Sequence, residues 1–289
     1  VPSAINPSTG TRALQTGDGV GVFFTRNDSL ICAGYSLWQD GQNMAISAWG
    51  DNDQTTMKDG FASGESIRYK IWDAQAGKEL GALVQYQTGG TTYTANGIYV
   101  LSSLVGYIAH GIRLPQGWNM ISSFVAPKDS TLDTVFVKIK PRMVIAKNGA
   151  GKVYWPALTI NTIGKWRSKD GYQLYMQSTD TLTINGDEIN PQQVPIIMSS
   201  GWSLVSYLRN SPMRADSAVT TLGGRLVIAK NGSGQIYWPS LSINTIGNLK
   251  PGHGYQMYLL SGGTLTYPVN AGPAPPSANR SADRPRRAH

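Results

Sequence analysis

The segment Asp51-x-Asp53-x-Thr55-x-x-x-Asp59 places four oxygen-bearing side chains at short intervals. Carboxylate and hydroxyl oxygens at such spacing are the ligands that calcium takes in loop sites, and a glycine follows at position 60 to turn the chain. The acidic residue expected at the twelfth position of such a loop is replaced by Ala62. The pattern therefore predicts calcium at these four residues, with a polar turn between two strands as the alternative.

Two pairs of adjacent aromatic residues offer a different chemistry, namely Tyr154-Trp155 and Tyr237-Trp238. Neighbours on a strand point to opposite faces, so one ring of each pair is expected in the core and the other on the surface. An outward ring in each pair would stack on a sugar or contact a protein partner. We take all four residues as candidate ligand or partner contacts. The alternative is that neither ring of a pair is free, because the core covers one and the neighbouring module covers the other.

The remaining reactive side chains give no pattern of a catalytic site. Cys32 and three histidines cannot supply an internal disulfide or a standard zinc site. His110 and His253 are isolated in the sequence from each other and from a Ser or Cys constellation. The run Gly149-Ala150-Gly151-Lys152 lacks the first glycine and the Ser or Thr of a phosphate loop, which favours a hairpin turn. We expect a protein that is not an enzyme and has no cofactor other than the candidate calcium.

The composition indicates the elements that must position these residues. The chain has 289 residues with 33 Gly, 16 Pro and only 15% charged residues. This density of Gly and Pro argues against a helical bundle, and the apolar share of 40% excludes a globally disordered chain. We expect an all-β protein of short strands and tight turns.

An internal repeat is the strongest signal in the chain. Val144–Asn185 aligns with Val227–Pro268 at an offset of 83, with 24 of 42 positions identical. Upstream, Gly117–Ser122 matches Gly201–Ser206 at an offset of 84. The pattern predicts two homologous small β-domains in tandem, over residues 114–191 and 192–270.

Each repeat contains a hairpin signal. Asn148-Gly149 and Asn231-Gly232 stand between runs of β-forming residues, and both residue types tolerate positive φ. Pro156 and Pro239 follow the second strand, which ends there because proline lacks the N–H of a central ladder. We expect the same hairpin in both repeats.

Residues 1–113 lack the repeat but are also rich in strand formers. Asn27-Asp28-Ser29 between two apolar runs predicts a hairpin, and further strands are expected, among them one at Met44–Trp49. Six or seven strands in this length fit an N-terminal antiparallel β-sandwich.

The net charge of +8 is unevenly distributed. Residues 1–113 carry 7 basic and 9 acidic residues (−2), residues 114–270 carry 14 and 7 (+7), and residues 271–289 carry 4 and 1 (+3). The last segment is a Pro/Arg-rich tail without aromatic residues, which is not expected to fold alone. Its basic residues are candidate partner contacts, with a solvated tail as the alternative: Arg280, Arg284, Arg286 and Arg287.

Several motifs carry a family resemblance. They are Gly17-Asp18-x-Val20-Gly21-Val22-Phe23, Trp49-Gly50-Asp51-Asn52-Asp53 and the repeated Gly-Trp, Tyr-Trp-Pro, Ile-Asn-Thr-Ile-Gly and Gly-Tyr-Gln runs. The chain resembles modules of large secreted or cell-surface proteins of Bacteroidota-like bacteria, which are associated with type IX secretion. The resemblance implies an extracellular or cell-surface location, a noncatalytic structural or accessory role, and no catalytic residue.

Two functions follow as expectations. The first is a structural subunit of a cell-surface or filamentous assembly, held by contacts between unlike β-modules of copies of this chain or of another surface protein. In this view the Val1–Leu14 segment adds a strand to a neighbour's sheet. The alternative is a carbohydrate-binding or adhesive accessory region of a larger secreted protein. We expect no nucleic-acid partner, because the basic residues of the repeats are scattered, and no transmembrane segment.

Overall fold

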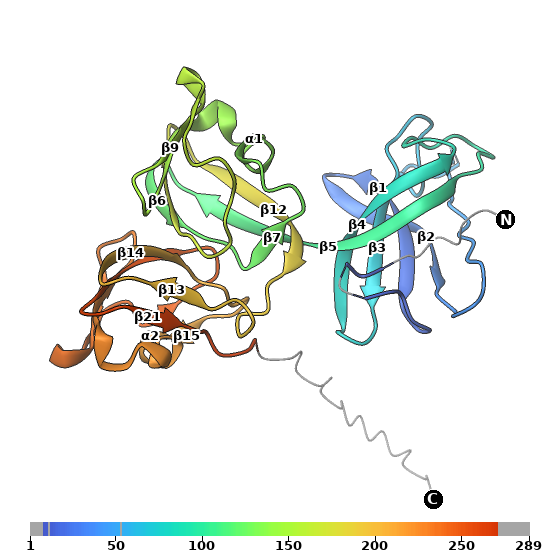
Figure 1. Ribbon diagram of the computed structural model, residues 1–289. Helices are drawn as coiled ribbons and strands as arrows, with labels where there is room; N and C mark the ends of the chain where they lie inside the picture. Colours follow the sequence, from blue (N-terminus) through green and yellow to red (C-terminus); the bar gives the residue numbers. More distant parts are fainter. Residues whose placement is uncertain (1–7, 11, 53, 271–289) are drawn as a thin grey trace, which may run out of the picture.

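The computed structural model describes residues 8–10, 12–52 and 54–270. They form an N-terminal sheet followed by two smaller β-units, as Figure 1 shows from blue to red. The predicted all-β fold is confirmed. No helix in these ranges is long and apolar enough to span a membrane. The tail with Arg280, Arg284, Arg286 and Arg287 lies outside the described residues.

Five antiparallel strands form the N-terminal sheet in the order β2-β1-β3-β4-β5. The turn between the first two strands is the predicted hairpin, because Asn27 and Asp28 both have positive φ (49° and 59°). The strands are β1 (Gly19–Arg26), β2 (Ser29–Leu37), β3 (Arg68–Asp73), β4 (Lys78–Thr88) and β5 (Val100–Leu114).

The long connection between β2 and β3 covers one face of this sheet. Met44 and Ile46 pack on the core of the sheet, and Phe61 is buried against Phe24. In the described part of residues 1–113, five strands of one sheet covered by this connection thus take the place of the six or seven strands expected for a sandwich. The strand predicted at Met44–Trp49 is wrong: the segment alternates between half-buried and exposed side chains, but it forms no ladder with a neighbouring strand.

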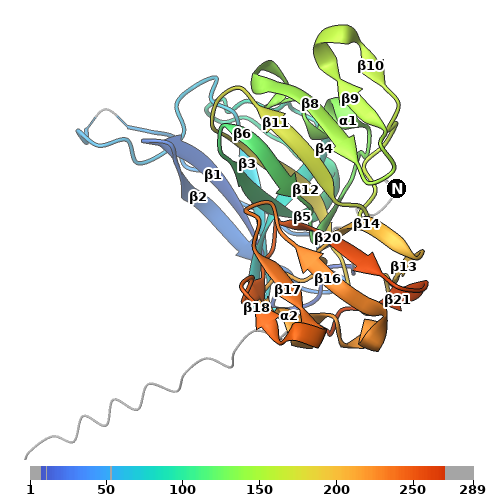
Figure 2. The same cartoon turned by 90° about the vertical axis from the view of Figure 1, so that its left-hand side faces the viewer.

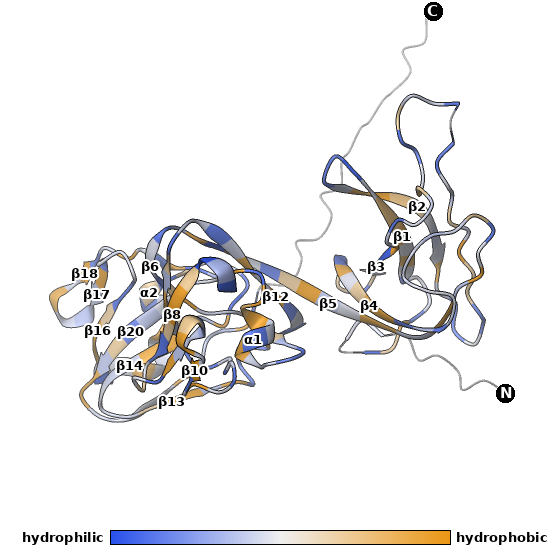
Figure 3. Cartoon of the chain, turned by 90° about the horizontal axis from the view of Figure 1, so that it is seen from above, coloured by the Kyte–Doolittle hydropathy of each residue, from blue (hydrophilic) through white to orange (hydrophobic). Residues whose placement is uncertain are grey.

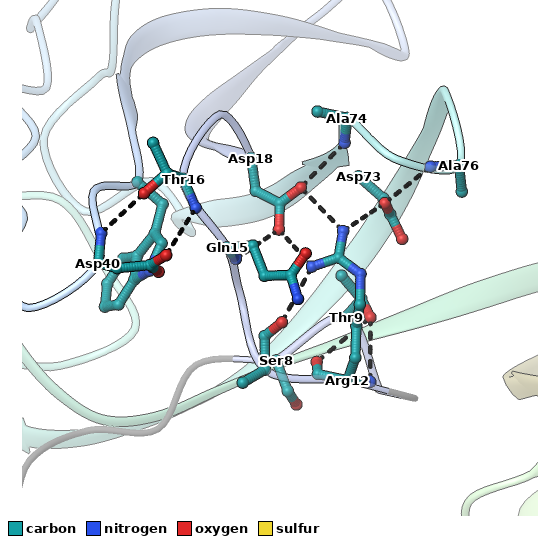
Figure 4. Close-up of polar contacts among 12 residues, drawn as sticks. Ser8, Thr9, Arg12, Gln15, Thr16, Asp18, Asp40, Asp73, Ala74 and Ala76 are labelled. Carbon is teal, nitrogen blue, oxygen red and sulfur yellow. Dashed lines mark hydrogen bonds and ion pairs between the residues drawn. The ribbon is translucent and has the colours of Figure 1, made fainter.

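A buried ion-pair network closes the N-terminal sheet at the start of β1. Both guanidinium nitrogens of Arg12 donate to the Asp18 carboxylate (2.7 and 3.0 Å), and one also donates to Asp73 at 2.6 Å (Figure 4). Each oxygen of this carboxylate also accepts from a backbone N–H group, Oδ2 from Gln15 and Oδ1 from Ala74. Burial alone would raise the pKa of Asp18, which is 1% exposed, but these hydrogen bonds hold it below its usual value.

Strand β5 belongs to two parts of the molecule. Its first half pairs with β4, and its second half, from Ile108 to Leu114, pairs with β12 (Asp180–Glu188) of the first repeat. Figure 3 shows this strand running from one part into the other. Ile112 and Leu114 lie in the hydrophobic core of the first repeat. The first repeat thus takes its first strand from before the predicted boundary at residue 114.

The first repeat encloses its core between β5, β7 and β12 on one side and a five-stranded sheet on the other. That sheet has the order β10-β9-β8-β11-β6. The remaining elements are β6 (Gly117–Ile121), β7 (Val125–Pro127), α1 (Leu132–Val135), η1 (Lys140–Arg142), β8 (Met143–Asn148), β9 (Val153–Trp155), η2 (Pro156–Leu158), β10 (Ile160–Asn161) and β11 (Tyr172–Met176).

The second repeat reproduces the five-stranded sheet but has two two-stranded ladders in place of β5, β7 and β12. Its five-stranded sheet has the order β14-β20-β16-β17-β18, which matches the first sheet strand for strand in reverse. Figure 2 shows the first sheet, in green, above the second, in orange. Its elements are β13 (Ile196–Met198), β14 (Gly201–Ser206), β15 (Met213–Arg214), α2 (Ala215–Ala218), η3 (Thr220–Arg225), β16 (Leu226–Lys230), β17 (Ile236–Trp238), η4 (Pro239–Leu241), β18 (Ile243–Asn244), β19 (Asn248–Leu249), β20 (Gly254–Leu259) and β21 (Gly263–Leu265).

The predicted hairpin forms in both repeats, but its glycines have different roles from those expected. The positive φ lies at Gly151 (75°) and Gly234 (79°), not at the Asn-Gly pairs. Gly149 and Gly232 instead approach the other repeat closely, as described below.

Glu188, the last residue of β12, joins all three parts of the molecule. Lys78 of the N-terminal sheet donates to Oε2 of Glu188 at 2.7 Å. Asn210 and Asn270 of the second repeat donate to Oε1 at 2.6 and 2.9 Å. This carboxylate therefore adds to the continuous strand β5 a link between the N-terminal sheet and both repeats.

Candidate binding site

The two repeats pack against each other about a quasi-two-fold axis. Ile121 pairs with His253, and Val205 pairs with Asp170, which are equivalent positions of the two repeats in exchanged roles. The hairpin of each repeat also reaches across to the edge strand of the other: Gly149 lies on Leu204, and Gly232 lies on Met120. These contacts bring side chains of both repeats into one surface.

Two tryptophans dominate this surface. Trp118 on β6 is 54% exposed and Trp202 on β14 is 51% exposed. Each stands beside a tyrosine of the neighbouring strand in an edge-to-face contact, with ring centres 5.3 Å apart for Trp118 and Tyr175 and 5.4 Å apart for Trp202 and Tyr258. Exposed indole rings are costly on a free surface and mark contact sites when they recur together.

A lysine ammonium lies over each indole ring. The Nζ atom of Lys147 is 5.1 Å from the ring centre of Trp118, and that of Lys230 is 4.8 Å from the ring centre of Trp202. Neither ammonium makes an ion pair with any carboxylate in the described part of the chain. The positive charges at these rings are thus available to a ligand.

A hollow of about 230 Å³ lies between the two repeats on this surface. From the first repeat it is lined by the hairpin with Lys147 and by Gln173; from the second it is lined by Trp202, Leu204 and Gln256. The side-chain amides of the two glutamines have no hydrogen-bond partner among the described residues. Each retains two donors and a carbonyl acceptor for a bound molecule.

The quasi-two-fold axis repeats this set of residue types. The internal repeat makes Lys147 equivalent to Lys230, Trp118 equivalent to Trp202 and Gln173 equivalent to Gln256. Of these equivalent pairs, only the two glutamines line the same hollow, so they are the pair that the two repeats share. The candidate site is one surface with two tryptophans, two lysines and a shared glutamine pair.

The aromatic pairs predicted from the sequence lie beside this surface. Tyr154 is the inward member of its pair: it is 3% exposed, packs against Phe136 and donates to Asp133 at 2.7 Å. Trp155 is half-buried, and strand alternation places it on the same outer face as Lys147. In the second repeat both Tyr237 and Trp238 are half-buried.

Trp118, Trp202 and the glutamine pair were missed as candidate residues. The signal was present, because the Gly-Trp motif of the upstream repeat contains both tryptophans and the Gly-Tyr-Gln motif contains both glutamines. What the sequence did not show is that strands from different repeats meet, which places these four side chains together.

The candidate calcium residues are occupied by hydrogen bonds within their own loop. The Asp51 carboxylate accepts from the backbone N–H of Asp59 at 2.8 Å, and the Asp59 carboxylate accepts from Asn52 and Thr55 at 3.1 and 3.2 Å. Asp53 lies outside the described residues. Elsewhere in those residues, too, no three His, Cys, Asp or Glu side chains form a group suited to a metal.

Calcium binding at this loop stays a prediction. A melting curve with and without millimolar calcium checks it: the expected result is a rise in melting temperature that Asp59→Asn removes, and an unchanged curve would reject the site.

A second hollow lies on the N-terminal sheet and is larger, at about 590 Å³. It is flanked by Tyr35 and Trp49, whose side chains are highly exposed. Its polar lining residues, Asn52 and Asp59, are already bonded to each other. This hollow offers fewer free polar groups than the surface between the repeats and is not duplicated in the chain.

His110 is not isolated from serine, as the sequence suggested. Its Nδ1 atom lies 2.9 Å from Oγ of Ser123. However, both residues are buried, Oγ also accepts from the backbone N–H of Val125, and no carboxylate of the described chain contacts the ring. Burial lowers the pKa of His110 to about 4. The pair is a packed element of the core rather than an accessible nucleophile and base.

Comparison of the chain with protein-family models, with curated proteins and with solved structures finds no match. The family resemblance seen in the sequence stays a prediction.

Proposed function

We propose that this chain is a noncatalytic carbohydrate-binding protein whose ligand lies on the surface between the two repeats. The observation that carries the proposal is the hollow in which Trp202 stands beside two unpartnered amides, those of Gln173 and Gln256. The same residue types recur around Trp118 through the duplication of the chain.

The chemistry of this surface matches that of a sugar. A pyranose ring has a flat face of C–H groups and a rim of hydroxyl groups. An exposed indole offers an apolar plane for the face, and a glutamine amide offers both a donor and an acceptor to neighbouring hydroxyls. A concave site with aromatic walls and a few oriented polar groups is the usual form of a small-ligand site.

The alternative of a self-assembling structural subunit has less support. It draws partner contacts from the basic tail, which lies outside the described residues. It also assigned the first residues of the chain to a neighbour's sheet, whereas Ser8 pairs with Leu104 and Gly106 of its own β5. We therefore favour the adhesive role, and with it the extracellular or cell-surface location that the sequence motifs suggest.

A glycan array tests the proposal. The intact chain is compared with Trp118→Ala and Trp202→Ala, and Trp49→Ala serves as the control, because this exposed tryptophan lies on the N-terminal sheet. We expect binding that both repeat variants weaken about tenfold or more and that the control leaves unchanged. Binding that survives both repeat substitutions, or no binding to any glycan, would reject the proposal.

A further inference from the structure

We propose that the ligand is an anionic polysaccharide, whose carboxylate or sulfate groups pair with Lys147 and Lys230 while one chain spans both tryptophans. This inference rests on the proposed carbohydrate-binding function and adds the charge and the reach of the ligand.

The free lysines carry the first part of the inference. Lys147 lines the hollow, and no Asp or Glu is among the residues that surround it. The ammonium groups of Lys147 and Lys230 each lie over an indole ring. Neither has a carboxylate partner in the described structure. An anionic group beside the indole would form charge-assisted hydrogen bonds with such an ammonium.

The surrounding charge favours the same ligand. Residues 114–270 carry 14 basic residues against 7 acidic ones. The field over the repeats is therefore positive, and it attracts an extended polyanion more strongly than a single sugar.

The position of the glutamines carries the second part. Gln173 and Gln256 line one hollow together and exchange with each other about the quasi-two-fold axis. Lys147, which lines this hollow beside Trp202, also lies over the Trp118 ring at 5.1 Å, so the hollow borders the surface around Trp118. A polymer long enough to reach both tryptophans binds at two points at once, which raises its affinity without any new type of contact.

The test compares three polymers of similar length by titration calorimetry: dextran as the neutral polymer, polygalacturonate as the carboxylate polymer and dextran sulfate as the sulfate polymer. Each is titrated into the intact chain, Lys147→Gln, Lys230→Gln and the double variant. Lys138→Gln is the matched control, because this exposed lysine of the first repeat does not line the hollow.

We expect at least one anionic polymer to bind about tenfold or more tightly than dextran, each lysine variant to lose part of this preference, and the double variant to lose it. The arm that binds more tightly, carboxylate or sulfate, identifies the anionic group. A disaccharide of the same polymer is expected to bind far more weakly than the polymer.

Three results would overturn the inference: equal affinity for dextran and both polyanions, equal losses for Lys138→Gln and Lys147→Gln, or a disaccharide as tight as the polymer. Equal affinities that Trp118→Ala and Trp202→Ala still weaken would remove the charge preference and leave the proposed function intact. Absence of binding to all three polymers and to the whole glycan array would remove both.

Discussion

Gly149 of the first repeat lies so close to Leu204 of the second that a Cβ on Gly149 would be 3.1 Å from the Leu204 Cβ. The equivalent Gly232 stands in the same relation to Met120, also at 3.1 Å. The contact is isologous, as in a two-fold dimer, but both halves belong to one chain. The close approach of each hairpin to the opposite edge strand brings Lys147 beside Trp202 and so creates the hollow.

Substitution of the glycines at the centre of this contact is expected to destabilise the protein. A Cβ on Gly254 would lie 2.7 Å from the carbonyl oxygen of Ile121, and one on Gly171 would lie 2.8 Å from that of Val205. Because backbone must then move, Gly254→Ala and Gly171→Ala should each lower the free energy of unfolding by about 1–3 kcal/mol. Urea denaturation measures this, with Gly224→Ala as the control, since a Cβ there meets open space. Equal stability of the three variants would contradict the packing described.

Substitution of Arg12 is expected to lower the free energy of unfolding, because a buried carboxylate loses its ion pair. Arg12→Ala leaves Asp18 in the core without its ion pair, which is expected to cost about 3 kcal/mol at neutral pH. Because the folded pKa of Asp18 is lowered, its contribution is present above the unfolded pKa of about 3.9 and is lost as the pH falls through the folded value. Urea denaturation at pH 7 and at pH 3 should therefore show a smaller effect of Arg12→Ala at pH 3. An equal effect at both would show that the charge is not responsible.

We expect the buried His110 to make the free energy of unfolding depend on pH, independently of Asp18. Its folded pKa of about 4 lies below the unfolded value of about 6.5, so the unfolded chain takes up the proton first as the pH falls. The stabilisation is fully present above pH 6.5 and is lost progressively between pH 6.5 and 4, by at most about 3 kcal/mol. His110→Gln should flatten the stability curve in this range, whereas His253→Gln should flatten it less, because His253 is exposed. A slope that His110→Gln leaves unchanged would contradict this prediction.

Glu188 is expected to hold the N-terminal sheet against the repeats. Glu188→Ala removes the acceptor for Lys78, Asn210 and Asn270 and should make the connection between the parts more sensitive to limited proteolysis. Glu79→Ala is the matched control, because this carboxylate also pairs with a lysine but is more than half exposed, and such pairs contribute less than about 1 kcal/mol. Identical cleavage of the two variants would argue against Glu188 as the junction.

The parts of the structure that depend on local sequence were predictable. The hairpin at Asn27-Asp28 and the repeated hairpins formed as expected, because turn residues between apolar runs determine them locally. The Met44–Trp49 segment has the alternation of a strand without the ladder, since pairing depends on which edges are available in the folded sheet.

The candidate site was only partly predictable, because it lies between repeats. Sequence reasoning assigned Gly149 to positive φ, whereas its requirement is the close approach to Leu204, a residue more than fifty positions away. One ring of the Tyr154-Trp155 pair was expected in the core; Tyr154 is the buried one, and Trp155 is half-buried. Trp118 and Gln173 also lie in motifs that recur in both repeats. Their position next to the second repeat, however, depends on tertiary packing.

The most direct test of the account is the indole N–H spectrum of the intact chain, recorded by nuclear magnetic resonance during titration with a glycan that the array identifies. Single Trp→Phe substitutions assign the signals. The account predicts that the indole signals of Trp118 and Trp202 shift together with increasing ligand, while that of Trp49 stays in place. A shift of Trp49 with no change at Trp118 and Trp202 would contradict it and would move the binding site to the N-terminal sheet.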